Sequence, residues 1–402
     1  MSQVPEPGKS DRNVRWASTM SGYAGPVRLA HADSSARIDR PNAAGGADDG
    51  ADGADGADGG AARGPLDREA REEREEGFLA PGATRAVGGG ERARAEEPDA
   101  WRTCFERDRD RILHAPSFRR LAGKTQVFVF PLDHQRTRLT HALEVAQVAT
   151  AIARTCRLNV ALTEAIALGH DCGHGPGGHA SEDALDPFLP GGFDHAPWGA
   201  HVSLAPLNLC AQTSDGIANH SWSRPAPSSP EGEVVSWADR VAYVCHDWED
   251  AVLTGIVSPR QLPPLVRDVC GERRSAQLSA FIHGVVAATL RTGQVGMEED
   301  AAEALSAFRA CNYERIYLRE ASVRQGEAVI HVLRALVEHF ADRPHLMADT
   351  SGHPSPDVLA GSQQALLAAV TYVAGMTDRF AFRQAVALLG WDPEKLPVGV
   401  GS

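Results

Sequence analysis

Residue types that bind metal ions lie inside three stretches of this 402-residue chain that have helical spacing. His141 falls on an apolar stripe that recurs every three to four residues, which turns its imidazole toward the interior of a helical protein. The pair His170-Asp171 ends a second such run, just before a glycine-rich segment, and Asp239 lies within a third. Two imidazoles and two carboxylates suit a divalent metal ion, so the pattern favours a metal site held among helices.

The arrangement of these residues carries more weight than the His-Asp dipeptide itself. The chain has 16 histidines and a second such pair at His246-Asp247, so one dipeptide is weak evidence. Ten of the histidines fall between His114 and His246, and burying unpaired imidazoles is costly enough that their clustering needs a reason. For His141 alone, a hydrogen-bonded core histidine remains the alternative interpretation.

Helical spacing dominates the chain from Arg107 onward and predicts an all-α fold, a helical bundle. The expected helices cover residues 142–156, 160–170, 234–254, 275–291, 300–311, 323–341, 357–374 and 378–389. The short run 125–130 has the composition of a strand that Pro131 would end.

The first hundred residues predict a disordered extension. Residues 41–63 repeat Ala-Asp-Gly without any branched or aromatic side chain, so they cannot bury enough apolar surface to offset chain entropy. Charge-rich, glycine-spaced sequence continues to about residue 99. We therefore expect an acidic low-complexity extension at 1–99 and a helical domain at 100–398, with a metal-binding core at about 107–254 and a C-terminal helical part at about 255–398.

The charge balance limits the partners. A formal net charge of −13 argues against a general nucleic-acid coat, so single-stranded DNA is not indicated as a partner. The stretch from Arg102 to Arg138 is nevertheless basic, which would suit a polyphosphate substrate. A solvated basic helix face is the alternative for Arg107, Arg109 and Arg111.

Cysteine usage and hydropathy indicate the compartment. The seven cysteines have no closely spaced pair, and several lie in apolar runs, which indicates buried, reduced thiols. No apolar run approaches 20 residues and the chain start lacks a secretory core, so we expect no membrane segment and a cytoplasmic location.

Several ordered motifs together resemble the HD-domain deoxynucleoside triphosphate triphosphohydrolases of the bacterial dGTPase-like family. The matching stretches are residues 107–114, 118–128, 136–141, 169–174, 178–182, 238–243 and 374–381. They span the chain from about Trp101 to Trp391, and several motifs in order are far more specific than any one of them.

The resemblance implies hydrolysis of dNTPs at the α-phosphate to deoxynucleoside and inorganic triphosphate. The implied metal ligands are His141, His170, Asp171 and Asp239, holding one divalent ion per subunit, Mg²⁺ or Mn²⁺ first, with Fe, Co or Ni as alternatives. The implied catalytic residues are His179, Glu182 and His195. Glu182 lies three residues after His179, close enough on a helix to orient that ring.

Five further residues are the expected substrate contacts. They are Gln126, Arg138, His174, Tyr243 and Asp247. Arg138 precedes His141 by three residues and would clamp a phosphate, while Gln126 and Asp247 would contact the 3′-hydroxyl. Core packing and surface salt bridges are the alternatives for these residues. Lys124 is a further candidate phosphate contact, and Tyr313, Arg315 and Tyr317 are candidates for the far wall of the pocket.

Three departures from the family pattern lie near the expected substrate. The loop Gly175–Gly178 lacks the usual paired prolines and phenylalanine, Arg240 replaces a second acid, and Ala196 replaces an asparagine. Other functions therefore stay open: an HD phosphohydrolase acting on nucleoside monophosphates, cyclic nucleotides or an alarmone, a catalytically weak nucleotide or single-stranded DNA sensor, or a purely structural protein. The resemblance also implies a homo-oligomer and allows an allosteric nucleotide.

Overall fold

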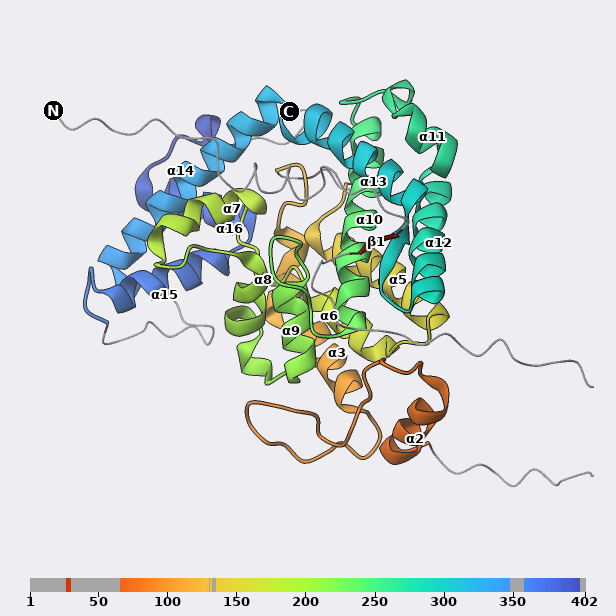
Figure 1. Ribbon diagram of the computed structural model, residues 1–402. Coiled ribbons are helices and arrows are strands. Elements are labelled where there is room, and N and C mark those ends of the chain that lie inside the picture. Colours follow the sequence, from red (N-terminus) through yellow and green to blue (C-terminus); the bar gives the residue numbers. More distant parts are fainter. Residues whose placement is uncertain (1–26, 30–65, 130, 132–134, 348–357, 398–402) are drawn as a thin grey trace, which may run out of the picture.

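The computed structural model describes residues 27–29, 66–129, 131, 135–347 and 358–397. Helices dominate this part of the chain, which confirms the expected all-α class (Figure 1). Two three-residue strands, β1 (Val27–Leu29) and β2 (Gly296–Glu298), pair antiparallel. The Ala-Asp-Gly tract at 41–63 lies outside the described residues. Every described helix is too short or too polar to span a lipid bilayer.

Three helices that pack against one another form the centre: α5 (Arg138–Thr155), α6 (Val160–Gly169) and α10 (Pro230–Leu253). The Asn159 side chain caps α6 by accepting from the Leu162 N–H, and the Ser229 hydroxyl caps α10 in the same way. These caps fix where each helix starts and, through the helical period, which side chains face inward.

The other helices surround this centre. They are α2 (Arg68–Phe78), α3 (Cys104–His114), α4 (Pro116–Arg120), α7 (His179–Leu185), α8 (His195–Trp198), α9 (Ala211–Asn219), α11 (Pro264–Cys270), α12 (Arg274–Thr292), α13 (Glu299–Asn312), α14 (Glu320–Asp342), α15 (Gln363–Ala374) and α16 (Asp378–Leu389). The eight helices expected from spacing all appear, but the one expected at 357–374 begins only at Gln363, because residues 358–362 form a turn. All seven cysteines are buried and free of disulfides, as predicted.

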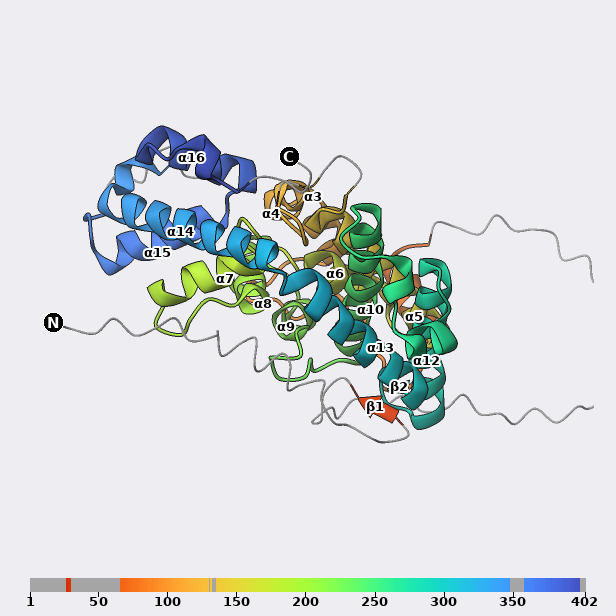
Figure 2. The same cartoon turned by 90° about the horizontal axis from the view of Figure 1, so that it is seen from above.

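Buried apolar side chains form two clusters. The main core contains α3, α5, α6 and α9 to α13, with side chains such as Val145, Ile166 and Trp237. The second core contains α14, α15 and α16 together with α7, through Leu185 and Phe340 among others. Figures 1 and 2 show these four helices together at one end of the molecule. The division between the cores therefore differs from the expected one near residue 254, because α7 packs with the C-terminal helices and α11 to α13 pack with the main core.

Residues 66–99 belong to the folded body, although the sequence placed them in the disordered extension. Helix α2 lies here, and Ala80, Ala83 and Ala86 are buried. The segment is held by polar contacts: the Thr84 N–H and hydroxyl donate to the buried Glu231 carboxylate at 3.0 and 2.7 Å. Residues 66–99 thus pack into the described body, because these hydrogen bonds compensate for the scarcity of large apolar residues.

The strand expected at 125–130 is absent from the described residues 125–129. Thr125 forms a single β-bridge with Thr137, and the residues after it bend instead of pairing with a neighbouring strand. Gln126, Val127 and Val129 line a cavity, so the alternating sequence reflects the wall of that cavity rather than a sheet.

Candidate functional site

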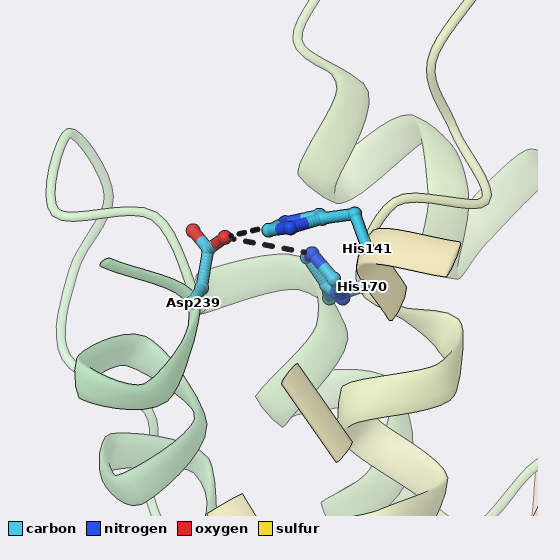
Figure 3. A group of neighbouring side chains, drawn as sticks. All are labelled: His141, His170 and Asp239. Atoms are coloured by element: carbon cyan, nitrogen blue, oxygen red, sulfur yellow. Dashed lines mark hydrogen bonds and ion pairs between the residues drawn. The ribbon is translucent and has the colours of Figure 1, made fainter. Parts of the chain in front are cut away.

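Three expected metal ligands, His141, His170 and Asp239, meet where α5, α6 and α10 converge, and the fourth, Asp171, lies beside His170. His141 Nε2 lies 3.0 Å from Asp239 Oδ1, and His170 Nε2 lies 3.7 Å from the same oxygen (Figure 3). His170 is the C-cap of α6, so Asp171 lies beyond the helix and its Oδ1 is 3.5 Å from His170 Nε2. The ligand atoms of His141, His170 and Asp239 all lie within 4.8 Å of one another, whereas Asp171 groups in this way with His170 and His220.

The histidine rings are oriented as metal ligands would be. The His170 Nδ1–H donates to the Ala167 carbonyl oxygen at 2.7 Å, which directs Nε2 toward the cluster. That Nε2 is buried without a hydrogen-bond partner, and His141 and His170 are only 2% and 1% exposed. An unpartnered buried acceptor costs free energy, and a cation is the ligand that neutral imidazole nitrogens accept. The donor set therefore fits a divalent metal ion.

The carboxylates of the cluster are held in the charged form. Burial opposes ionisation of Asp171, but the Arg138 charge and the neighbouring imidazoles place its pKa well below the ordinary value. Burial also opposes ionisation of Asp239, yet its hydrogen bond to His141 lowers the pKa. The pKa of His141 is shifted down by burial and more strongly up by Asp239, so its net pKa is raised. This concentration of negative charge favours a cation.

Arg138 reaches the cluster from the first turn of α5. Its Nη1 donates to Asp171 Oδ2 at 2.8 Å, whereas its Nε and Nη2 are buried without hydrogen-bond partners. A Cβ on Gly178 would come within 2.6 Å of Nη2, so only glycine leaves the guanidinium its space. Two unpartnered N–H groups of a guanidinium that is 1% exposed indicate a place for an anion.

A histidine chain leads away from the cluster. Glu182 Oε1 accepts from the His195 N–H at 3.0 Å and contacts His195 Nδ1 at 2.5 Å. The His220 Nδ1–H donates to the Ile217 carbonyl oxygen, which leaves its Nε2 to accept from His195 Nε2 at 3.2 Å. With both ring nitrogens donating, His195 is assigned as an imidazolium. Burial opposes that charge, but Glu182 raises the pKa of His195 overall.

Glu182 is expected to support His179, and in the structure it also hydrogen-bonds with His195. His179 is the first residue of α7 and lines the cavity. The surrounding protein, together with the charge of Arg138, lowers the pKa of His179 to about 4, so this ring is neutral at pH 7. His174 stacks on His195 with ring centroids 3.7 Å apart, and its Nε2 is 3.2 Å from Asp171 Oδ1.

The opposite wall of the site comes from α10 and the turn after α13. Tyr243 and Asp247 line the cavity from α10, and the Tyr317 hydroxyl donates to Asp247 Oδ2 at 2.5 Å. Burial raises the pKa of Asp247 to about 7. Gln126 lines the cavity as well, so this set forms a polar wall beside the metal cluster.

All these groups border one cavity of about 410 Å³, a size typical of small-molecule sites. Of the predicted residues, eleven line it directly: Gln126, Arg138, His141, Asp171, His174, His179, Glu182, His195, Asp239, Tyr243 and Asp247. The remaining one, His170, does not line the cavity, and its Nε2 lies 3.7 Å from Asp239 Oδ1. The candidates Tyr313 and Tyr317 also form part of the wall.

Two residues of the cavity were missed by sequence reasoning. His220 lines it, and its position in a short polar segment gave no sign of this role. Arg240 was noted only as a departure; it is buried, and its guanidinium carbon lies 3.9 Å from the Trp222 ring centre. Behind it, Arg309 Nε donates to the Tyr243 hydroxyl at 2.9 Å. The cavity thus has a cationic end that the spacing around Asp239 alone could not reveal.

The basic residues that the sequence favoured for phosphate lie elsewhere. Arg107 and Arg111 pair with Glu96, and Arg109 pairs with Asp110, on the outer face of α3. They form surface ion pairs of small energetic value. Lys124 also proves not to be a phosphate contact, because its Nζ donates to the backbone carbonyl oxygens of His174 and Ala374.

Comparison with known proteins agrees with this geometry. Residues 138–244 match the HD domain and residues 295–386 match the phosphohydrolase-associated domain. The chain is 40% identical to a deoxyguanosinetriphosphate triphosphohydrolase-like protein of Caldanaerobacter subterraneus, over 78% of this chain and 93% of that protein. It is 38% identical to a protein of that name from Clostridium perfringens, over 72% and 87% of the two chains. The corresponding protein of Desulfatibacillum aliphaticivorans is 36% identical, over 78% and 95%.

Proposed function

Because this chain belongs to the deoxyguanosinetriphosphate triphosphohydrolase-like family of HD-domain phosphohydrolases, we propose that it hydrolyses deoxynucleoside triphosphates at the α-phosphate. The products are the deoxynucleoside and inorganic triphosphate. Water adds its oxygen to the α-phosphorus, the bond from phosphorus to the 5′-oxygen breaks, and the departing 5′-oxygen takes up a proton.

The observation that carries the proposal is the pair of unpartnered N–H groups of Arg138 beside the metal cluster. A planar guanidinium with two open donors matches a phosphate with two oxygens. One donor of the same group already holds Asp171, so a phosphate bound to Arg138 lies next to the four metal ligands. Arg240, with Arg309 behind it, supplies further positive charge for the outer phosphates.

His141, His170, Asp171 and Asp239 would hold one divalent cation, with Mg²⁺ or Mn²⁺ as the first candidates. Such a cation polarises a phosphoryl oxygen and lowers the pKa of bound water. Neutral His179 accepts the proton that the attacking water loses. His195, kept protonated by Glu182, donates a proton to the departing 5′-oxygen. His174, whose ring stacks on the His195 ring, contacts the substrate.

The deoxyribose would lie against the wall formed by Tyr243, Tyr317 and Asp247. Asp247 accepts from the 3′-hydroxyl, and Gln126, which also lines the cavity, contacts the same group. Tyr317 donates to Asp247 and is therefore fixed in place, so a ring stands where a 2′-hydroxyl would need room. This arrangement favours deoxynucleotides over ribonucleotides.

Product identity tests the proposal most directly. Purified full-length protein is incubated with each dNTP and Mn²⁺, and the phosphorus products are resolved by ³¹P NMR. We expect tripolyphosphate with deoxynucleoside; pyrophosphate with deoxynucleoside monophosphate would refute the cleavage position. Tight binding without any product would instead favour a nucleotide sensor. Running the same assay with dNTP mixtures shows whether an allosteric nucleotide exists, because an activator raises turnover only in its presence.

A further inference from the structure

The candidate site lies between the two hydrophobic cores. His141, His170 and Asp239 are carried by helices of the main core, or by the end of one. His179 and Glu182 are carried by α7, whose Ala184 and Leu185 are buried in the second core. The distance from the metal ligands to the residues on α7 therefore depends on how the two cores are joined, and not only on the packing inside either core.

Asp378, the first residue of α16, makes contact with both sides of this junction. Its Oδ2 accepts from the Thr125 N–H at 2.9 Å and from the Thr125 hydroxyl at 2.6 Å. Its Oδ1 accepts from the Gly177 N–H at 2.9 Å. The side chain is 2% exposed, so both carboxylate oxygens are used inside the protein. Hydrogen bonds to a buried charged acceptor are among the stronger polar contacts, at about 1.5–3 kcal/mol each.

The segment anchored by Asp378 has little stiffness of its own. Three of the four residues from Gly175 to Gly178 are glycines, which lose more conformational freedom on ordering than any other residue. Gly177 and Gly178 have φ values of +74° and +63°, and a Cβ on Gly177 would come within 2.4 Å of Val329 on α14. The loop packs closely against its neighbours, but its glycines leave the backbone flexible. It therefore needs contacts from other segments to hold one conformation.

Lys124 supplies a second anchor at the other end of the same loop. Its buried ammonium group donates to the His174 carbonyl oxygen and, at 3.0 Å, to the Ala374 carbonyl oxygen at the end of α15. Within the loop, the Ser181 hydroxyl accepts from the Gly175 N–H at 3.0 Å and donates to the Gly178 carbonyl oxygen at 2.6 Å. The two charged side chains thus tie the loop to the C-terminal helices at the residues that flank its glycines.

We propose that Asp378 is a positioning residue for the reaction: through Gly177 and Thr125 it sets where His174 and His179 stand relative to the metal ligands. This inference rests on the proposed function for its effect on turnover. It assigns to the phosphohydrolase-associated helices a direct part in building the site. It also explains how a loop with three glycines keeps one conformation, since polar contacts hold it at Gly177 and at His174.

Asp378→Asn in the full-length protein is the main test. One carboxylate oxygen becomes an NH₂ group that faces an N–H or O–H donor, so one anchor is lost at nearly unchanged volume. Misplacing a reacting group by about 1 Å can reduce turnover by about 100-fold, and we expect kcat with dGTP and Mn²⁺ to fall by about 10- to 100-fold. The assay is run at a temperature at which circular dichroism shows the variant fully folded. Mn²⁺ stoichiometry should stay as in the unsubstituted protein, because the metal ligands belong to the main core.

Asp392→Asn is the matched control. Asp392 is an acidic residue in the same C-terminal part, where it accepts from the Glu394 N–H at 3.0 Å, and it is exposed. This variant should keep kcat within about twofold. A second readout does not depend on turnover: hydrogen exchange of the amides from His174 to Glu182 should accelerate at least tenfold in Asp378→Asn and not in Asp392→Asn.

The two readouts separate this inference from the proposed function. If the unsubstituted protein turns over no dNTP, the proposed function fails and the exchange result alone decides whether Asp378 fixes the loop. If the folded Asp378→Asn protein keeps normal kcat, or if loop exchange is unchanged, the positioning role is wrong. A purely structural role would lower the unfolding temperature and leave kcat of the folded protein intact.

Discussion

At the scale of single residues, the site is defined by polar groups that are buried without partners. Arg138 presents two unpartnered nitrogens to the cavity, which suit an anion, and His170 in the adjacent His/Asp cluster has one unpartnered nitrogen, which suits a cation. Burying such groups costs free energy, which the fold recovers only when a ligand binds. These residues therefore report on function more directly than those whose hydrogen bonds are already satisfied.

Replacing Arg138 with lysine separates charge from geometry. A lysine ammonium keeps the positive charge. It cannot, however, both donate to Asp171 and bind a phosphate through two parallel hydrogen bonds. We expect kcat/KM for dNTP hydrolysis to fall by about 100-fold in Arg138→Lys, while bound metal, measured by elemental analysis, stays unchanged. Arg107→Lys, at a surface ion pair with Glu96, is the control and should match the unsubstituted protein. Equal kcat/KM in the two variants would exclude Arg138 from substrate binding.

The meeting of His141, His170 and Asp239 could be predicted from the ordered sequence motifs, whereas the cationic end of the cavity could not. His141 shares the buried face of α5 with Val145 and Val148, so its inward direction follows from spacing, whereas α10 is buried along most of its length and spacing alone does not single out Asp239. Arg240 follows Asp239 directly in the sequence. In the fold its guanidinium lies over the Trp222 ring and donates to the Tyr243 hydroxyl, and the spacing around Asp239 does not reveal these contacts. Lys124 was misjudged for the same reason, since its carbonyl partners lie 50 and 250 residues away.

At the scale of elements, the segment from α2 to residue 100 differs most from what the sequence predicts. Its sequence is charged and rich in glycine, which in isolation predicts disorder. In the fold its charges meet buried partners: Arg92 pairs with Asp108 at 2.6 Å with both side chains almost fully buried. An ion pair of this kind produces no periodic pattern in the sequence. Helical spacing therefore predicts the main helices but does not predict that this segment is folded.

Glu75 gives this segment a testable pH dependence. Burial raises its pKa to about 7 from the ordinary 4.5, while its oxygens accept from the Ala86 N–H and the Asn159 amide. The folded chain therefore binds this proton more tightly than the unfolded chain, so the contribution of Glu75 to stability is full below pH 4.5 and declines up to about pH 7.

Denaturant unfolding at a series of pH values measures this effect. Relative to Glu75→Gln, the unsubstituted protein should lose at most about 1.4 kcal/mol of unfolding free energy per pH unit between pH 4.5 and 7. Glu76→Gln, at an exposed neighbouring position, should leave the pH dependence unchanged. Parallel pH profiles for Glu75→Gln and the unsubstituted protein would contradict the assignment.

At the scale of the whole molecule, the four metal ligands concentrate negative charge where three helices meet. A cation that binds only the folded state stabilises it, by about 2.7 kcal/mol at a concentration 100 times its Kd. We expect Mn²⁺ to raise the midpoint of thermal unfolding of the full chain by several degrees and to have no such effect on Asp239→Ala. Asp392→Asn should respond as the unsubstituted protein does. An equal Mn²⁺ response in Asp239→Ala would place the stabilising ion elsewhere.

Anomalous diffraction from a crystal grown with Mn²⁺ tests the central claim most directly, because it locates the ion without reference to activity. The account predicts one manganese peak within about 2.4 Å of ligand atoms of His141, His170, Asp171 and Asp239. A peak held instead by Asp171, His174 and His195, which also cluster closely enough to bind an ion, would contradict it, as would the absence of any peak in the cavity.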